Sequence, residues 1–345
     1  MSPTSYQLLH PALSITPSKS FLDWECIVTA LEVYLQAYFQ KNTPDTLELP
    51  FPELPAGHKS GFVSIIGKPN AGKSTLLNQI LGRKLSITTP KAQTTRHRIF
   101  GIDSGEDYQV VYSDTPGLIR PRYKLHERMM GFINHSLEDA DLMILLIAAD
   151  ETFPEDDLMA LAQKTQIPKV LVLNKVDAVS EAEALSRMAS LASQVDFVAA
   201  LPVSALKGHN VDTLKEVILQ HLPEGPPFFD KDQISDRPER FFVGEMIREQ
   251  LFLLLKDELP YSTEVEIEEF EEDEQLARIH ATIHVERQSQ KGMIIGKGGS
   301  MLKKIGSRAR PGIERFLGVK VFLKLYVRVT DGWKNRDNSL RGFGY

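Results

Sequence analysis

The stretch Gly61-Phe-Val-Ser-Ile-Ile-Gly-Lys-Pro-Asn-Ala-Gly-Lys-Ser74 decides the fold of the first large unit in this 345-residue chain. Its apolar start, residues 62–66, is typical of a buried strand, and residues 75–81 have helical spacing. Between them lies Gly-x-x-x-x-Gly-Lys-Ser, whose glycines let backbone N–H groups converge beside the positive end of a helix. A strand, this loop and a helix in that order predict a polyphosphate site rather than a structural glycine turn.

Two side chains of the loop have chemistry that suits bound phosphates. Lys73 is expected to reach the outer phosphates, and the Ser74 hydroxyl is expected to ligate Mg²⁺. The nucleotide contacts predicted for this stretch are Gly67, Lys68, Pro69, Asn70, Ala71, Gly72, Lys73, Ser74 and Thr75.

Composition and charge limit the classes of protein to consider. With 42% apolar and 25% charged residues, the chain is typical of a globular protein with two or three domains. The single cysteine, Cys26, leaves no intrachain disulfide framework, and no apolar run approaches the ~20 residues of a membrane span. The start of the sequence lacks the pattern of a secretory signal. These features favour a cytoplasmic protein.

Charge is unevenly distributed along the chain. Residues 257–274 contain ten acids and no base, whereas residues 291–345 contain thirteen Lys or Arg against three acids. The basic end predicts an anionic partner, while the acidic run fits the solvated face of a hairpin.

The order of strand-like and helix-like segments predicts two folded units. Residues 59–225 alternate between them, which predicts an α/β domain with a six-stranded mixed sheet. Residues 241–345 predict a smaller α+β domain in the order α-β-β-α-α-β. Residues 1–58 are expected to form an extension with a helix at 21–40 and a proline-rich linker, and residues 226–240 a second linker.

The motif Asn174-Lys-Val-Asp177 follows a predicted strand, at the sheet edge where ligands of such sheets bind. The Asp177 carboxylate can accept hydrogen bonds from N1–H and the 2-amino group of guanine, whereas adenine has neither donor. Later in the chain, Ser204-Ala-Leu206 can present backbone N–H groups to the guanine O6. The predicted base contacts are Asn174, Lys175, Asp177, Ser204, Ala205 and Leu206. A phosphate loop followed by these motifs predicts a GTP site.

Two further motifs are placed to sense the γ-phosphate. Asp114 is expected to hold a water of the Mg²⁺ shell, and Gly117 to offer its backbone N–H. In Gln93-Thr-Thr-Arg96, Thr95, or failing that Thr94, is the expected Mg²⁺ ligand. The predicted contacts after the strand are Asp114, Thr115, Pro116, Gly117 and Leu118, and the predicted catalytic residues are Lys73, Thr95, Asp114 and Gly117.

The five motifs together resemble the translation-factor-related GTPases of the TrmE-Era-EngA branch. Leu118 stands where Ras-like proteins have a catalytic glutamine, so no side-chain amide can orient water from that position. The resemblance implies that Asn70 helps to bind an activating K⁺ ion, which makes K⁺ a second cofactor besides GTP or GDP and Mg²⁺. It also implies two switch regions, residues 84–98 and 114–130.

In the basic region, Gly296-Lys-Gly-Gly299 resembles the Gly-x-x-Gly loop of a type II KH domain, which binds single-stranded nucleic acid. An anion turn without RNA is the alternative. Apolar residues beside the loop, including Ile305, are expected to form the floor of the base-binding groove. The predicted RNA contacts are Lys291, Ile294, Ile295, Gly296, Lys297, Gly298, Gly299, Lys303, Lys304 and Arg308.

A phosphate-loop GTPase joined to a KH domain resembles the Era family, from residue 61 to the end of the sequence. The resemblance implies binding to the 3′ end of small-subunit ribosomal RNA, not DNA, and a role in maturation of the 30S subunit. It implies a monomer in the cytoplasm and leaves open peripheral contact with the inner face of the cell membrane. Two alternatives remain: an RNA-binding module that hardly hydrolyses its nucleotide, and a tRNA-modification GTPase of the same branch.

Overall fold

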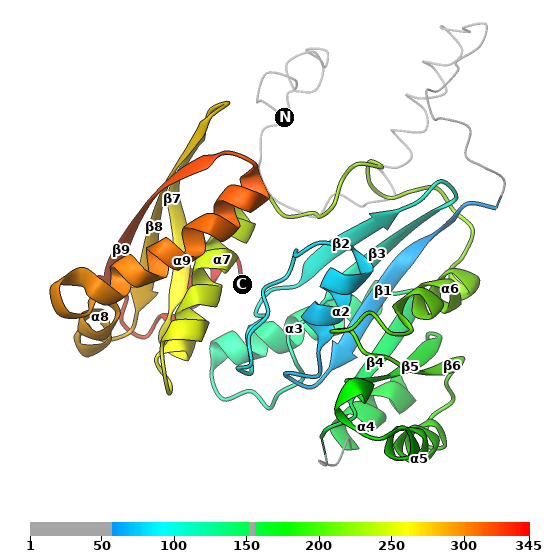
Figure 1. The fold of residues 1–345 in the computed structure, drawn as a ribbon. Helices are drawn as coiled ribbons and strands as arrows, with labels where there is room; N and C mark the ends of the chain where they lie inside the picture. The colour runs from blue at the N-terminus through cyan, green and yellow to red at the C-terminus, as the bar shows by residue number, and fades with distance from the viewer. Residues whose placement is uncertain (1–56, 152–155) are drawn as a thin grey trace, which may run out of the picture. The chain divides into compact units, whose positions relative to one another are not determined.

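The computed structural model describes residues 57–151 and 156–345, and the helix predicted at residues 21–40 lies outside these ranges. The first sheet has six strands in the order β2-β3-β1-β4-β5-β6 (Figure 1). They are β1 (Lys59–Gly67), β2 (Ile99–Ser104), β3 (Tyr108–Asp114), β4 (Leu142–Ala148), β5 (Lys169–Asn174) and β6 (Ala199–Pro202). All neighbours are parallel except β2, which is antiparallel to β3. The predicted six-stranded mixed sheet is therefore confirmed.

Helices cover both faces of this sheet. They are α2 (Lys73–Ile80), α3 (Lys124–Glu138), α4 (Asp156–Lys164), α5 (Glu181–Ala192) and α6 (Val211–His221). One core cluster contains Leu76 of α2 and Leu214 of α6, and another contains Ile133 of α3, Leu158 of α4 and Leu191 of α5. All seven residues of β4 are buried, as expected for a strand covered on both faces.

Strand order places the candidate site. The connection after β1 leads to β2 and β3 on one side, whereas the connection after its neighbour β4 leads to β5 on the other side. The carboxyl ends of β1, β3, β4 and β5 share one edge. Ligands of open α/β sheets bind at such a point. The loop after β1, the Asp114 motif after β3 and the Asn174 motif after β5 all start there.

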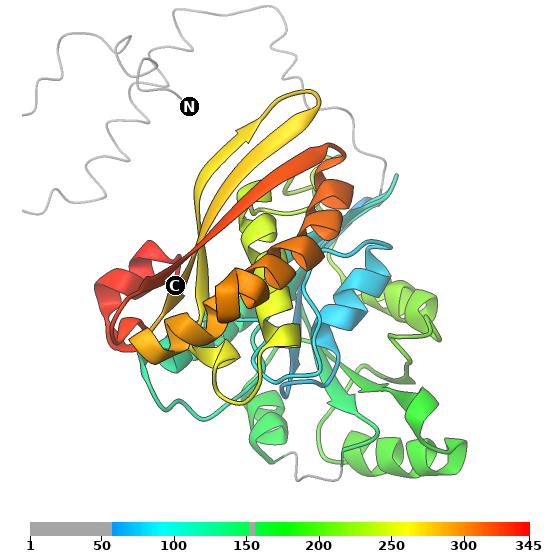
Figure 2. The ribbon, with the colours of Figure 1, turned by 60° about the vertical axis from the view of Figure 1, so that its left-hand side comes forward.

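The second unit contains a three-stranded sheet in the order β7-β8-β9, which Figure 2 shows as a twisted layer crossed by α9. Its elements are α7 (Glu239–Leu254), β7 (Glu264–Glu272), β8 (Leu276–Val285), α8 (Gln288–Ile295), α9 (Ser300–Leu317) and β9 (Lys320–Val329). The β7–β8 pair is antiparallel and the β8–β9 pair is parallel. The predicted order α-β-β-α-α-β is confirmed, and the acidic run lies largely on β7 and the following turn.

The sequence predicts no element after β9, but the structure has the short helix α10 (Asp337–Gly342). Trp333 and Leu340 of this last segment form a buried cluster with Leu125 and Met129 of α3. The segment therefore joins the second unit to the helix that follows the Asp114 motif. Within the described ranges, no helix combines the length and apolarity needed to cross a membrane.

Candidate nucleotide and RNA sites

A cavity of about 460 Å³ lies at the loop between β1 and α2, within the size range of small-ligand sites. The predicted site residues that line it are Pro69, Asn70, Gly72, Lys73, Ser74, Thr75, Thr95, Gly117 and Lys175. Asp150 and Glu151 also line the cavity, although they belong to none of the sequence motifs. Their position directly after β4, at the same sheet edge, is the signal that identifies them.

The Lys73 side chain lies beneath the loop and is almost fully buried. Its Nζ donates hydrogen bonds to the carbonyl oxygens of Gly67 at 3.1 Å and Lys68 at 2.9 Å. Burial lowers the pKa of Lys73 to about 8, although the charges of Asp114 and Glu151 act to raise it. A bound polyphosphate would supply the negative charge that this buried ammonium group lacks.

Three oxygen-bearing side chains meet at the start of α2. Ser74 Oγ donates a hydrogen bond to Asp114 Oδ2 at 2.7 Å and lies 2.8 Å from Thr95 Oγ1. Among the described residues, Asp114 Oδ1 is a buried oxygen without a hydrogen-bond partner. Burial raises the pKa of Asp114, while Ser74 and Lys73 lower it. Oxygen donors of this kind fit Mg²⁺.

The same geometry distinguishes the two candidate threonines. Thr94 Oγ1 donates a hydrogen bond to the carbonyl of Lys91 at 2.7 Å and also contacts Thr89 Oγ1. Thr95 instead faces Ser74. The arrangement therefore favours Thr95 as the Mg²⁺ ligand.

The segment after β3 contacts the phosphate loop through its backbone. A Cβ atom on Gly117 would lie 2.5 Å from the Pro69 nitrogen, so only glycine permits this approach. The Leu118 N–H donates to the Gly67 carbonyl at 3.1 Å, and the Leu118 side chain packs against the core. Thr115 Oγ1 bonds to the Ile65 carbonyl, so this side chain holds β1 rather than a ligand.

Asn174 joins three of the motifs. Its Nδ2 donates to the Ala71 carbonyl at 2.8 Å, and its Oδ1 accepts from the Ala205 N–H at 2.9 Å. Gly72 has φ +102°, and a Cβ there would lie 2.2 Å from Asn174 Nδ2. Asn174 thus fixes the phosphate loop and the Ser204 loop relative to each other, a structural role that the sequence alone does not reveal.

Of the predicted base-reading residues, only Lys175 lines the cavity, and the others lie beside it. Asp177 is exposed, and its Oδ1 accepts a hydrogen bond from Ser204 Oγ at 2.5 Å. Lys175 lines the cavity, and its Nζ lies 3.0 Å from Asp150 Oδ1. Leu206 is 73% exposed. The base side of the site is therefore open to solvent, while the phosphate side is enclosed.

Asn70, the candidate K⁺ ligand, is exposed at the mouth of the cavity with φ +64°. Its Nδ2 donates to the Pro90 carbonyl at 3.0 Å. Because the amide nitrogen makes this bond, the amide oxygen is the atom that would ligate a cation.

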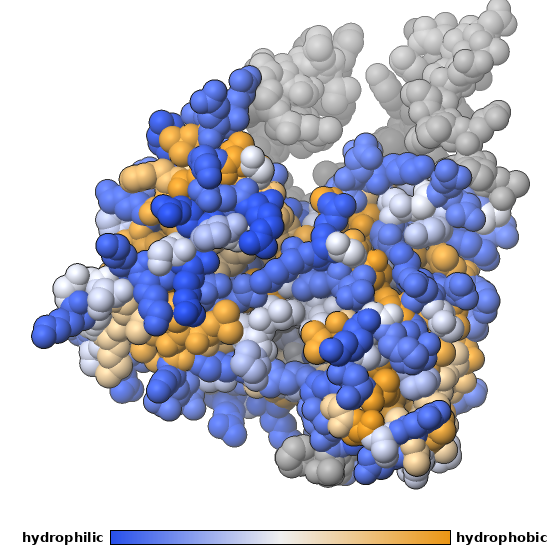
Figure 3. All heavy atoms as spheres, in the orientation of Figure 1, coloured by the Kyte–Doolittle hydropathy of each residue, from blue (hydrophilic) through white to orange (hydrophobic). Residues whose placement is uncertain are grey.

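The glycine-rich turn of the second unit connects α8 to α9. Gly296, Gly298 and Gly299 all have positive φ, at +72°, +58° and +79°. A Cβ on Gly298 would meet no atom within 4 Å, so the backbone is open to approach there. The basic residues Lys297, Lys303, Lys304 and Arg308 are exposed, and Lys291 is half-buried. Figure 3 shows mostly hydrophilic side chains along α9.

One part of the predicted RNA surface is corrected. The side chains of Ile294 and Ile305 are fully buried in the core of the second unit, so they cannot form the floor of a base-binding groove. Ile295 is only partly buried and packs against that core. The inward faces of α8 and α9 carry these isoleucines, and sequence alone did not separate core positions from groove positions.

Comparisons with known proteins agree with the division of the chain into two folded units. Residues 62–175 match the family described as 50S ribosome-binding GTPase, and residues 258–334 match the KH domain family. A structure of an Aquifex aeolicus Era variant bound to GDP and AlF4⁻ is 38% identical and covers 83% of this chain and 99% of its own, with a TM-score of 0.79. A structure of Era with MgGDPNP and nucleotides 1506–1542 of 16S ribosomal RNA has the same identity and coverage and a TM-score of 0.77.

The fold and the two sites define a phosphate-loop GTPase that carries a KH domain on the same chain. The protein hydrolyses GTP, and it has the domain order and motifs expected from its sequence. The chain belongs to the Era family of GTPases.

Proposed function

We propose that this protein is a GTP-driven switch that binds the 3′ end of small-subunit ribosomal RNA through its KH domain and assists maturation of the 30S subunit. The observation that carries the proposal is the likeness, over 99% of its length, to an Era bound to both MgGDPNP and 16S ribosomal RNA. The proposed surface for GTP is the loop between β1 and α2, and the proposed surface for RNA is the glycine-rich turn between α8 and α9. The proposal assigns this chain to ribosome assembly and not to tRNA modification.

The proposed catalytic roles follow from the positions of the side chains. Lys73 stabilises charge on the outer phosphates, and the Gly117 N–H holds the γ-phosphate. Ser74 and Thr95 would ligate Mg²⁺ directly, and Asp114 would hold a water of its shell. When bound, Mg²⁺ neutralises charge that develops on the phosphate oxygens.

Crosslinking the protein to total RNA in cells and sequencing the bound fragments tests the proposed partner. Fragments from the 3′ end of small-subunit ribosomal RNA should predominate in the wild-type sample. Enrichment of tRNA would instead support the tRNA-modification alternative.

Hydrolysis is expected to be slow and roughly 10-fold faster in K⁺ than in Na⁺, because a cation on the Asn70 amide oxygen would add positive charge at the transition state. Leu118, packed into the core, offers no amide to orient water. Steady-state phosphate release in the two salts measures the effect, with Asn70→Ala as the variant that should lose it. Equal wild-type rates in K⁺ and Na⁺ would remove the K⁺ proposal.

GTP affinity is expected to fall as pH rises through about 8, the pKa of Lys73 in the ligand-free protein. Above this pH the amine is neutral and must take up a proton before it can pair with phosphate, which weakens binding by up to about tenfold per pH unit. Calorimetric titration from pH 7 to pH 9 measures this, and guanosine controls for ionisation of the base. Constant GTP affinity up to pH 9 contradicts the expectation.

We further propose that the protein acts as a monomer in the cytoplasm, where small subunits assemble. Peripheral attachment to the inner face of the cell membrane is the second location that the family resemblance allows. Cell fractionation distinguishes them: recovery with ribosomal particles supports the first location, and recovery with membranes supports the second.

A further inference from the structure

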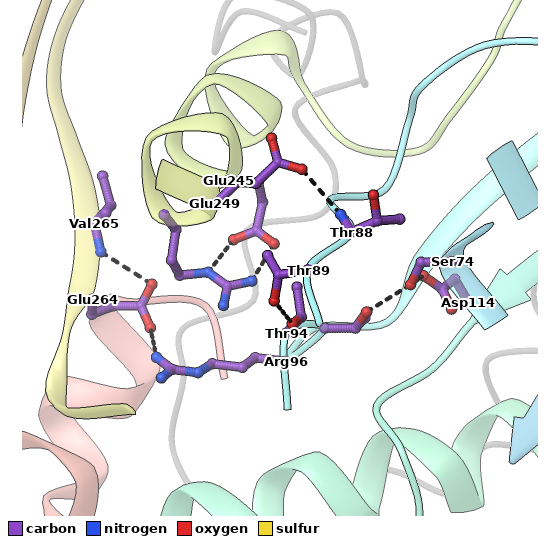
Figure 4. Close-up of polar contacts among 12 residues, drawn as sticks. Ser74, Thr88, Thr89, Thr94, Arg96, Asp114, Glu245, Glu249, Glu264 and Val265 are labelled. Carbon is purple, nitrogen blue, oxygen red and sulfur yellow. Dashed lines mark hydrogen bonds and ion pairs between the residues drawn. The ribbon is translucent and has the colours of Figure 1, made fainter. Parts of the chain in front are cut away.

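The segment between α2 and β2, residues 84–97, contacts both domains; we call it the switch segment. Thr95 faces the GTP site, with its Oγ1 2.8 Å from Ser74 Oγ. The next residue, Arg96, extends into the KH domain, where its guanidinium pairs with Glu264 (Figure 4). A single peptide unit therefore connects a side chain of the GTP site to one held by the KH domain.

The KH domain surrounds the guanidinium of Arg96 with acceptors. Arg96 Nη1 donates to the Thr263 carbonyl at 2.7 Å and to Glu264 Oε2 at 3.0 Å. Its Nη2 donates to the carbonyls of Pro260 at 3.4 Å and Tyr261 at 3.2 Å. The side chain is 2% exposed, so this site fixes a charge that is removed from water. The aromatic rings of Phe252 and Trp333 lie 5.6 and 5.9 Å from the guanidinium carbon.

Glu264 of the KH domain is the ionised partner of Arg96. Its Oε2 also accepts a hydrogen bond from the Tyr345 hydroxyl at 2.6 Å, and its Oε1 accepts from the Val265 N–H at 3.1 Å. Burial opposes ionisation, but Arg96 and Arg248 outweigh it and hold the pKa of Glu264 below its ordinary value. The pair is therefore a buried ion pair in which both terminal guanidinium nitrogens and both carboxylate oxygens have hydrogen-bond partners.

The rest of the switch segment also contacts the KH domain through α7. Glu249 Oε1 accepts from the Thr88 N–H at 3.1 Å, and its Oε2 accepts from Lys84 Nζ at 2.7 Å. Figure 4 shows the contacts of Thr88 and Arg96 in one view. Lys84 is exposed, whereas Arg96 is buried and adjoins Thr95, so Arg96 is the contact most directly linked to the Mg²⁺ site.

We propose that Arg96 and Glu264 are positioning residues for GTP hydrolysis, through which the KH domain holds Thr95 in reach of Mg²⁺. Switch segments of GTPases become ordered when the γ-phosphate and its metal are bound, and ordering a flexible segment costs conformational entropy. A segment already fixed at Arg96 loses less entropy when Thr95 ligates the metal. The proposal rests on the proposed Mg²⁺ role of Thr95.

The test uses the full chain with the conservative variants Arg96→Lys and Glu264→Gln. Both should raise the Mg²⁺ concentration for half-maximal GTP hydrolysis by about 10-fold to 100-fold, because misplacing a reacting geometry by about 1 Å has effects of that order. Affinity for GDPNP in Mg²⁺ should fall, and affinity for GDP should not, because Thr95 contributes only when a γ-phosphate is present. An unchanged Mg²⁺ requirement in both variants would overturn the proposal.

Two further variants separate this inference from its premise and from loss of folding. Thr95→Ala tests the premise: if it leaves the Mg²⁺ requirement unchanged, the assigned role of Thr95 fails first. If Thr95→Ala raises the requirement and Arg96→Lys does not, only the positioning role fails. Arg278→Ala, which removes an exposed ion pair with Asp273 in the β7–β8 hairpin, should leave the requirement unchanged. Equal losses of GDP and GDPNP affinity in Arg96→Lys would indicate general disruption and also overturn the proposal.

Discussion

Replacing Asp177 by Asn is expected to lower GTP affinity by roughly 100-fold to 10,000-fold and to raise affinity for xanthosine triphosphate. Two hydrogen bonds from guanine to a charged acceptor contribute about 1.5–3 kcal/mol each. Ser204 Oγ already orients the carboxylate through Oδ1, and each carboxylate oxygen can accept a further bond. Asparagine keeps one acceptor but presents an N–H group towards the guanine donors, whereas xanthine offers a carbonyl oxygen in place of the amino group.

Competition between GTP and xanthosine triphosphate for a fluorescent nucleotide analogue measures this change. Asp212→Asn is the matched control, because Asp212 is an exposed carboxylate in the first turn of α6, away from the cavity lining. It should leave the ratio of affinities at the wild-type value. The same ratio in Asp177→Asn and the wild type would show that Asp177 does not read the base.

Replacing both Lys297 and Gly298 by Asp is expected to reduce affinity for the 3′ end of small-subunit ribosomal RNA by about 100-fold or more. The change removes a cation and adds two anions at the turn that approaches the RNA backbone, and phosphate contacts dominate such affinities. Nothing lies within 4 Å of a Cβ at Gly298, and Asp tolerates positive φ better than most residues, so the fold should survive. GTP binding should remain unchanged.

Fluorescence anisotropy with a labelled RNA of this sequence, at several salt concentrations, measures the loss. Gly318→Asp provides a matched control, because Gly318 also has positive φ and an open Cβ position but ends α9 instead of starting it. It carries the same backbone strain and should retain most of the RNA affinity. Wild-type affinity in the Lys297 and Gly298 double variant would refute the KH assignment.

The nucleotide motifs could be predicted from sequence because each depends on local geometry. Gly72 and Gly117 leave no room for a side chain, and the fully buried β4 produces an unbroken apolar run. Motif order then identified which strand ends would meet. The roles of these residues in catalysis and metal binding stay proposals, because the structure describes the arrangement of their side chains and the variants above test their action.

The contacts between the two domains could not be predicted in the same way. Arg96 belongs to the motif that contains Thr95, yet its partners Thr263 and Glu264 lie more than 160 positions later in the chain. No periodicity connects residues so far apart. The helix after β9 and the packing of Trp333 and Leu340 could not be predicted for the same reason, because residues of α3 complete their apolar cluster.

The burial of Ile294 and Ile305 could not be predicted from the sequence for a different reason. A helix beside a binding groove has one apolar face against the core and another towards the ligand, and both carry similar residues. Only the packing of α8 and α9 on the sheet separates these faces. The exposed basic residues on α9 remain the proposed RNA contacts.

Measuring RNA affinity in the presence of saturating GDPNP or GDP shows whether the nucleotide site controls the RNA site. Coupling of this kind typically changes affinity by about 5-fold to 150-fold and acts equally in both directions. We predict tighter RNA binding with GDPNP, and a GDPNP affinity raised relative to that of GDP by the same factor when RNA is saturating. Equal RNA affinity in the two nucleotide states would contradict the account.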